Sequence, residues 1–171
     1  MEIKLENIEP LETNIELNSK LMDDVVIGII APYCKDLDNY VEFIRDILKD
    51  GENPPSNNEL DDFCLNLSTL IYFASGMCEQ LGIRDDISRA LYKEIYHSKR
   101  SELEHGTVAD KNSLAELQSQ NEQLTNICFN RAYKIMKAKV EAAQELLGSC
   151  KKVLSRRMSE LELTNLSGGG R

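Results

Sequence analysis

The sequence predicts an all-α protein, and three observations lead to that prediction. Its longest uninterrupted pattern runs from Thr107 to about Leu163, without proline and with Gly148 as its only glycine. Apolar residues recur at helical spacing in this segment and in several earlier ones. No segment shows a persuasive alternation of apolar and polar residues, which would predict strands. We expect a small N-terminal helical bundle followed by a long C-terminal helix, or by a coiled-coil-like helical hairpin hinged at Gly148.

The N-terminal part is predicted to contain an arm and two short helices. Residues 1–20 place glutamates among isolated apolar residues and include Pro10, which favours a mobile acidic arm. Helices are expected over residues 21–30 and 36–49, because Pro32 interrupts the apolar pattern between them.

Residues 21–105 are predicted to form the helical bundle, with a linker inside it. Gly51 and the pair Pro54–Pro55 cannot continue a helix, and Ser56 or Asn57 can cap the helix that follows.

Two further helices are predicted in the bundle after this linker. The first should reach about Leu81, because Gly82 suits a helix C-terminus. The second should begin at Asp85 and Asp86, whose charges favour a helix N-terminus, and run toward His105.

The long helix is predicted over residues 107–163, followed by a flexible tail at 164–171. Thr107 and Asp110 have the spacing of a capping box, with Asp in the place of Glu. Apolar residues on this helix fall on one continuous stripe, which a small protein cannot bury alone. The stripe predicts packing on the chain's own bundle or on further copies, and its candidate oligomer-interface residues are Ile135, Val140, Leu146, Leu147, Val153, Leu154, Met158 and Leu161.

The net charge of −9 is unevenly divided along the chain. Residues 1–92 hold 7 Lys or Arg against 19 Asp or Glu, whereas residues 93–171 hold 13 against 10. Within residues 129–157, eight Lys or Arg oppose two Glu, a balance of +6. This polarity favours a basic surface on an otherwise acidic protein, and its candidate nucleic-acid-binding residues are Arg131, Lys134, Lys137, Lys151, Lys152, Arg156 and Arg157.

The basic face also has a purely structural interpretation. Cations near a helix end are favoured by the helix dipole, and Lys137 and Glu141 have the spacing of an intrahelical pair. Lys139 and Arg157 project into the apolar stripe, where they should extend to the surface or meet a partner. A second candidate basic group consists of Lys93, Lys99 and Arg100. It is interleaved with rings on which unstacked bases could rest, those of Tyr92, Tyr96 and His97, although the two tyrosines could equally be core.

The five cysteines form no CxxC pair and lie mostly among apolar neighbours, which predicts reduced, buried thiols. The chain has no apolar run of roughly 18 residues and no signal-like start, so a cytoplasmic protein without a membrane partner is expected. Nucleotide-binding, zinc-protease and serine-hydrolase motifs are missing from the sequence. We therefore expect no enzymatic activity, no cofactor and no metal.

Three features in succession resemble a known family. They are the helix containing residues 90–96, the break at residues 105–111, and the long helix closing in residues 151–157. This order, over about residues 84–162, resembles small helical proteins of tailed phages that are grouped as UvsY-like recombination mediators. The resemblance implies an oligomeric, non-enzymatic factor in the host cytoplasm that binds single-stranded DNA and assists a recombinase against a single-strand binding protein.

Two functions are consistent with these patterns. The first is an oligomeric phage accessory factor that binds single-stranded DNA through its C-terminal helix during recombination or replication. The second is a protein-only adaptor or inhibitor, whose acidic N-terminal half docks on a host or phage enzyme and whose long helix serves as an oligomerisation stalk.

Overall fold

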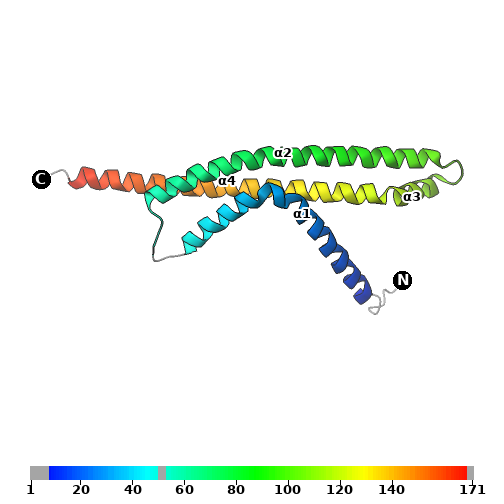
Figure 1. Ribbon diagram of the computed structural model, residues 1–171, viewed down its shortest axis with the longest axis horizontal. Helices are drawn as coiled ribbons and strands as arrows, with labels where there is room; N and C mark the ends of the chain where they lie inside the picture. The colour runs from blue at the N-terminus through cyan, green and yellow to red at the C-terminus, as the bar shows by residue number, and fades with distance from the viewer. Residues whose placement is uncertain (1–7, 50–52, 169–171) are drawn as a thin grey trace. The chain divides into compact units, whose positions relative to one another are not determined.

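The computed structural model describes residues 8–49 and 53–168, which form four helices and no strand (Figure 1). The helices are α1 (Ile8–Lys49), α2 (Asn57–Glu102), α3 (Val108–Gln118) and α4 (Gln120–Gly168). The predicted all-α fold and the long C-terminal helix are confirmed. No helix in the described ranges combines the length and apolar character that a bilayer span requires.

Helix α1 differs from the prediction because it continues through Pro32. The two short helices predicted around this proline are therefore wrong, and the predicted arm is helical from Ile8, while residues 1–7 lie outside the described residues. A proline inside a helix removes one N–H donor and crowds the carbonyl four residues earlier. That carbonyl belongs to exposed Gly28, so it can tilt outward and be hydrated.

Helix α2 is also continuous, so the predicted break at Gly82 is wrong. A glycine inside a helix costs about 1 kcal/mol relative to alanine. Here its missing side chain permits close packing, because a Cβ at Gly82 would lie 3.3 Å from a ring carbon of Tyr133 on α4. Tertiary packing therefore outweighs the local preference.

The predicted long helix is interrupted at Ser119, whereas Gly148 lies inside α4. Buried Ser119 donates its hydroxyl to the carbonyl of Ala115 at 2.7 Å, a bond that bends helices. Backbone bonding nevertheless continues across the bend, since the Ser119 N–H also donates to Ala115. At its other end α4 extends to Gly168, into the predicted tail.

Both predicted caps are present. Ser56 Oγ accepts from the Glu59 N–H, and Glu59 Oε2 accepts from the Ser56 N–H at 2.7 Å. Thr107 and Asp110 form the corresponding reciprocal pair at the start of α3. These hydrogen bonds hold the pKa of the Glu59 and Asp110 carboxyls below their usual values. Each cap anchors the first turn of its helix.

The chain divides into two compact units that are not successive in sequence. Unit 1 comprises residues 1–32 and 80–134, and unit 2 comprises residues 33–79 and 135–171. The units therefore cut across the predicted segments 21–105 and 107–163. Helices α1, α2 and α4 each contribute one stretch to both units.

Unit 2 has an apolar interior. Its buried positions follow one another at intervals of mostly three and four residues, the spacing that keeps one helix face against its neighbours. They are Cys34, Leu37 and Ile44 on α1, Leu60, Phe63, Cys64, Leu67, Ile71, Ala74 and Cys78 on α2, and Met136, Val140, Ala143 and Cys150 on α4.

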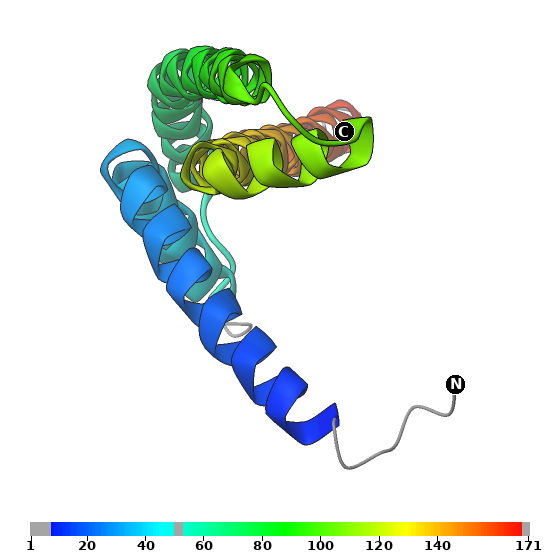
Figure 2. The same ribbon diagram turned by 90° about the vertical axis from the view of Figure 1, so that its right-hand side faces the viewer.

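Unit 1 contains a polar network between α2 and α4, which run antiparallel there (Figures 1 and 2). Asp85 is 4% exposed and accepts from Arg89 at 2.7 Å, from the Asn130 amide at 3.0 Å and from the Asn126 amide at 3.2 Å. Asn126 also donates to buried Ser88 at 3.0 Å. A buried polar network of this kind specifies the register of two helices.

Replacing Asp85 by Ala should lower the free energy of unfolding by about 2 to 3 kcal/mol, because buried amide donors lose their charged acceptor. The matched control is Asp86→Ala, since Asp86 neighbours Asp85 but its side chain is 79% exposed. The control should change stability by less than about 0.5 kcal/mol. Urea unfolding at equal protein concentrations measures the free energy of unfolding of both variants. Equal decreases in the two variants would contradict the assigned role of Asp85.

Candidate nucleic-acid interface

The cations of α4 in unit 2 divide into exposed and internal groups. Lys137, Lys151, Lys152 and Arg156 are exposed. Lys139 and Arg157 are partly buried and bonded to other elements. The sequence predicts that Lys139 and Arg157 extend to the surface or meet a partner, because both project into the apolar stripe.

Lys139 is held by a carboxylate of α1. Its Nζ lies 2.6 Å from Asp38 Oδ1 and 2.8 Å from Oδ2, with both side chains about one-third to two-fifths exposed. Cys34 donates its thiol to the same carboxylate at 3.2 Å. Lys139 is therefore neutralised within unit 2 and is not part of a free basic face.

Arg157 is held by the linker before α2. Its guanidinium donates to the backbone carbonyl of Pro55, which is itself buried. An apolar groove of about 260 Å³ lies beside this bond, lined by residues of α1, the linker, α2 and α4. Arg157 therefore bonds the linker to α4, and its role in nucleic-acid binding stays a prediction.

Lys151, Lys152 and Arg156 form the exposed set that we call the basic cluster. Within the described ranges neither lysine forms an ion pair, and Arg156 lies 3.7 Å from Glu160 in an exposed pair worth little. The cluster spans about 8 Å along the helix axis at 1.5 Å per residue. One copy thus offers three adjacent, solvated cations.

The helix dipole does not explain the basic cluster. Helix α4 continues to Gly168, so the cluster lies more than two turns before the helix end, beyond the reach of the helix dipole. The intrahelical pair expected between Lys137 and Glu141 is not among the ion pairs of the described residues.

Unit 1 carries the other predicted basic residues. Arg131 and Lys134 are exposed on α4, and Arg100 is exposed on α2. Lys99 is partly buried and lies 3.1 Å from Glu102.

The rings of this second basic group are less accessible than its cations. Tyr92 and Tyr96 are partly buried, with ring centroids 6.3 Å apart, so they contribute in part to packing. His97 is exposed beside Tyr96.

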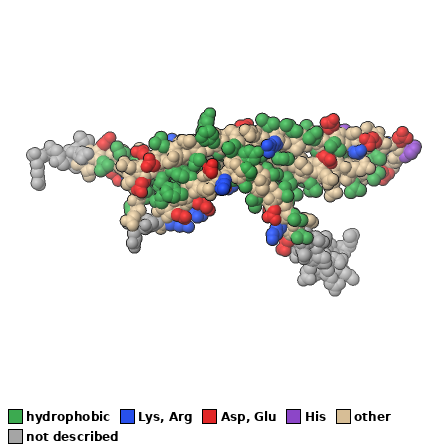
Figure 3. Space-filling view, in the orientation of Figure 1, with side chains coloured by type: hydrophobic (Ala, Val, Ile, Leu, Met, Phe, Trp, Pro, Cys, Tyr) green, Lys and Arg blue, Asp and Glu red, His purple; other side chains and the backbone are tan. Residues whose placement is uncertain are grey.

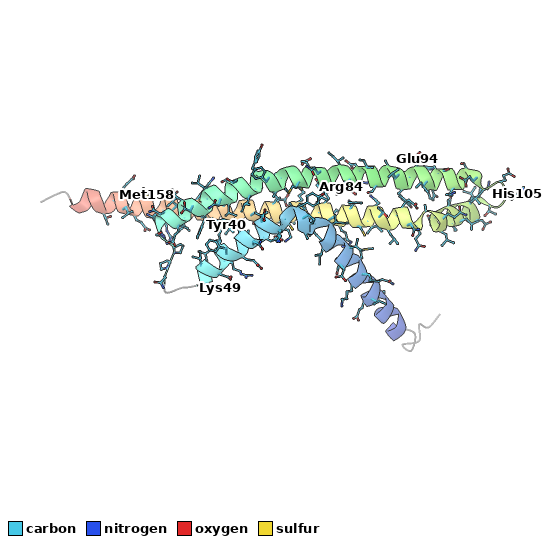
Figure 4. All side chains as sticks on the ribbon, in the orientation of Figure 1. Tyr40, Lys49, Arg84, Glu94, His105 and Met158 are labelled. Carbon is cyan, nitrogen blue, oxygen red and sulfur yellow. The ribbon has the colours of Figure 1, made fainter. Side chains whose placement is uncertain are left out.

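The predicted oligomer stripe is mostly occupied within the chain itself. Val140 is buried, and Leu146, Leu147, Val153 and Leu154 are partly buried against their own unit. Ile135, Met158 and Leu161 are exposed, at 38%, 48% and 51%. Met158 lies on the C-terminal stretch of α4 (Figure 4). Packing on the chain's own helices therefore accounts for most of the stripe.

The cysteines are free, as predicted, and four of the five are buried. Burial, together with the hydrogen bond to Asp38, raises the pKa of the Cys34 thiol to about 11. Burial also raises the pKa of Cys64, Cys78 and Cys150. These thiols are protonated at neutral pH and are poor nucleophiles.

Neither a metal centre nor a related protein points to a function. In the described part of the chain, no three His, Cys, Asp or Glu side chains gather where they could hold a metal ion. No protein-family model, curated protein or solved structure matches the chain.

Sequence reasoning did not identify the polar network around Asp85. Asn126 and Asn130 lie one helical turn apart, but Glu122, Gln123 and Lys134 on the same side of the helix are also polar, so the sequence does not single out the two asparagines.

Alkylation by iodoacetamide at pH 8 should modify Cys128 first, because it is the partly buried cysteine. The other four should react only after denaturation, since burial shields them and their raised pKa values keep them protonated. Peptide mass spectrometry over time reports each site. If Cys34 and Cys128 were alkylated at equal rates in the folded protein, the result would contradict the packing around Asp38.

Proposed function

We propose that this protein is a non-enzymatic, oligomeric accessory factor that binds single-stranded DNA through the basic cluster on α4. The observation that carries the proposal is the division among the α4 cations. Lys139 and Arg157 serve the fold, whereas Lys151, Lys152 and Arg156 stay solvated although the chain as a whole is acidic. Solvated cations of this kind can neutralise phosphates without breaking any internal bond.

Assembly is part of the proposal because three cations make a weak site. Affinity for a phosphate backbone rises with the number of phosphates neutralised, and linked copies bind with an increased effective concentration. Several copies would multiply the basic cluster along one strand.

The resemblance to UvsY-like mediators supplies the biological setting of the proposal. In that setting the factor acts in phage recombination or replication, in the host cytoplasm, beside a recombinase and a single-strand binding protein. The resemblance rests on the helix order and residues 151–157.

A protein-only adaptor is the second candidate, and a specific observation favours it. The stretch of α2 from Asn57 to Ile83 contains no Lys or Arg, and it exposes Glu59, Asp61, Asp62 and Glu79. An acidic surface of this kind could dock on a basic face of another protein.

Replacing Lys151 and Lys152 by Gln should weaken binding to single-stranded oligonucleotides at least tenfold at about 50 mM salt. The slope of log affinity against log salt should flatten by about 1.4 for each bound copy, because each phosphate that is no longer neutralised lowers the slope by roughly 0.7. Fluorescence anisotropy over a salt series measures both quantities.

The matched control is Lys139→Gln with Arg157→Gln, which removes two cations from the same helix. We expect the control to keep the salt slope and to lose about 1 kcal/mol or more of stability, since it breaks internal bonds. If the unaltered protein shows no binding at about 50 mM salt, the DNA proposal fails and the adaptor is retained. Equal slopes in the two variants would exclude the basic cluster as the DNA-binding surface.

A further inference from the structure

The apolar side chains of unit 1 lie mostly outside its core. Its buried apolar residues are only Val26, Ile30, Leu81, Ala115 and Ala132 among the described residues, whereas all three residues of the buried polar set, Asp85, Ser88 and Ser119, belong to it. The large apolar side chains that it exposes are Ile15, Leu17, Leu21, Val25, Ile27, Ile83, Ile87, Leu91, Val108, Leu114, Leu117 and Leu124.

Unit 2 shows the opposite distribution, with fourteen buried apolar residues in its described part. It exposes fewer large apolar side chains than unit 1, and Tyr72 and Leu65 are the most exposed of them, at 75% and 69%. In the space-filling view, hydrophobic side chains reach the surface along α2, α3 and α4 (Figure 3). Unit 2 can therefore be stabilised by its own core, whereas unit 1 lacks a comparable one.

Two of the exposed apolar residues of unit 1, Ile87 and Leu91, line a groove of about 370 Å³ between α2 and α4. Ile83, Ile87 and Leu91 follow one another at four-residue intervals on α2 and are 58%, 55% and 49% exposed. Ile87 and Leu91 line the groove, and Phe129 of α4 lines it from the other side. The other residues that line the groove are polar or charged, so its apolar surface comes from Ile87, Leu91 and Phe129.

The groove also contains an unsatisfied acceptor. Glu122 lines it, and the Oε2 atom of Glu122 is buried without a hydrogen-bond partner among the described residues. A buried carboxylate oxygen without a donor is costly. Arg84, labelled in Figure 4, lies on the opposite wall.

We propose that a second copy of this chain occupies the groove, packing through its own unit 1. The exposed area supports this occupant. Twelve large side chains, 42% to 67% exposed and spread over the four helices, carry on the order of 700 Å² of apolar surface in total. A stable interface takes about 800 Å² from each partner.

Unit 1 also supplies the matching surface itself. Its stretch of α1 exposes Leu17, Leu21 and Val25 at four-residue intervals, which makes an apolar helix face suited to a groove. The inference locates the assembly on which the proposed function relies. The proposed interface lies on unit 1, whereas the sequence predicted an interface on the apolar stripe of α4.

The test compares two double variants of the full chain by sedimentation velocity at about 5 to 100 μM. Ile87→Asp with Leu91→Asp places charges in the groove face, and Leu65→Asp with Tyr72→Asp places them at exposed positions of α2 in unit 2. The groove variant should weaken association at least tenfold, and the control should associate like the unaltered chain. Circular dichroism checks that helix content is kept, and Leu91→Ala, which adds no charge, should weaken association several-fold.

Three results would overturn the inference. They are a monomeric unaltered chain at 100 μM, association that survives both groove variants, and equal weakening by the control. The first would assign the groove to a different protein. Association without DNA binding would overturn the proposed function and support this inference, whereas DNA binding by a monomeric chain would overturn this inference alone.

Discussion

The pairing of α2 with α4 is the constraint on which both units depend. In unit 2 the pairing is held by apolar side chains at intervals of mostly three and four residues, which the hydrophobic effect drives together. In unit 1 the same two helices meet through Asp85, Ser88 and Asn126. Apolar packing supplies most of the stabilisation, whereas the polar network fixes which residues of α2 face which residues of α4.

This division has a consequence for function. Because Lys139 and Arg157 are bonded to Asp38 and Pro55, the packing of α4 leaves the basic cluster as its solvated cations on this part of the helix. Unit 1 buries few apolar side chains and exposes many. The two proposals, binding of a phosphate backbone and self-association, therefore rest on different residues and can be tested separately.

The sequence predicted the helices better than their ends. Helical periodicity and the capping pairs at Ser56 and Thr107 depend on residues that are close in sequence, so the sequence predicts them. Pro32 and Gly82 are local breakers that tertiary packing overrides, and Tyr133, which packs on Gly82, is far away in sequence. Contacts between residues far apart in the sequence also determine the environments of Lys139 and Arg157. Their positions in the apolar stripe were predictable, but their partners lie about 100 residues away.

The mass of the unaltered chain in solution tests the central claim most directly, because the proposed occupant of the unit 1 groove is a second copy of the chain. Light scattering of a purified sample at micromolar concentration, without nucleic acid, gives that mass. The account predicts a multiple of 19.4 kDa that decreases on dilution. A constant mass of 19.4 kDa over the whole concentration range, in a fully folded protein, would contradict it.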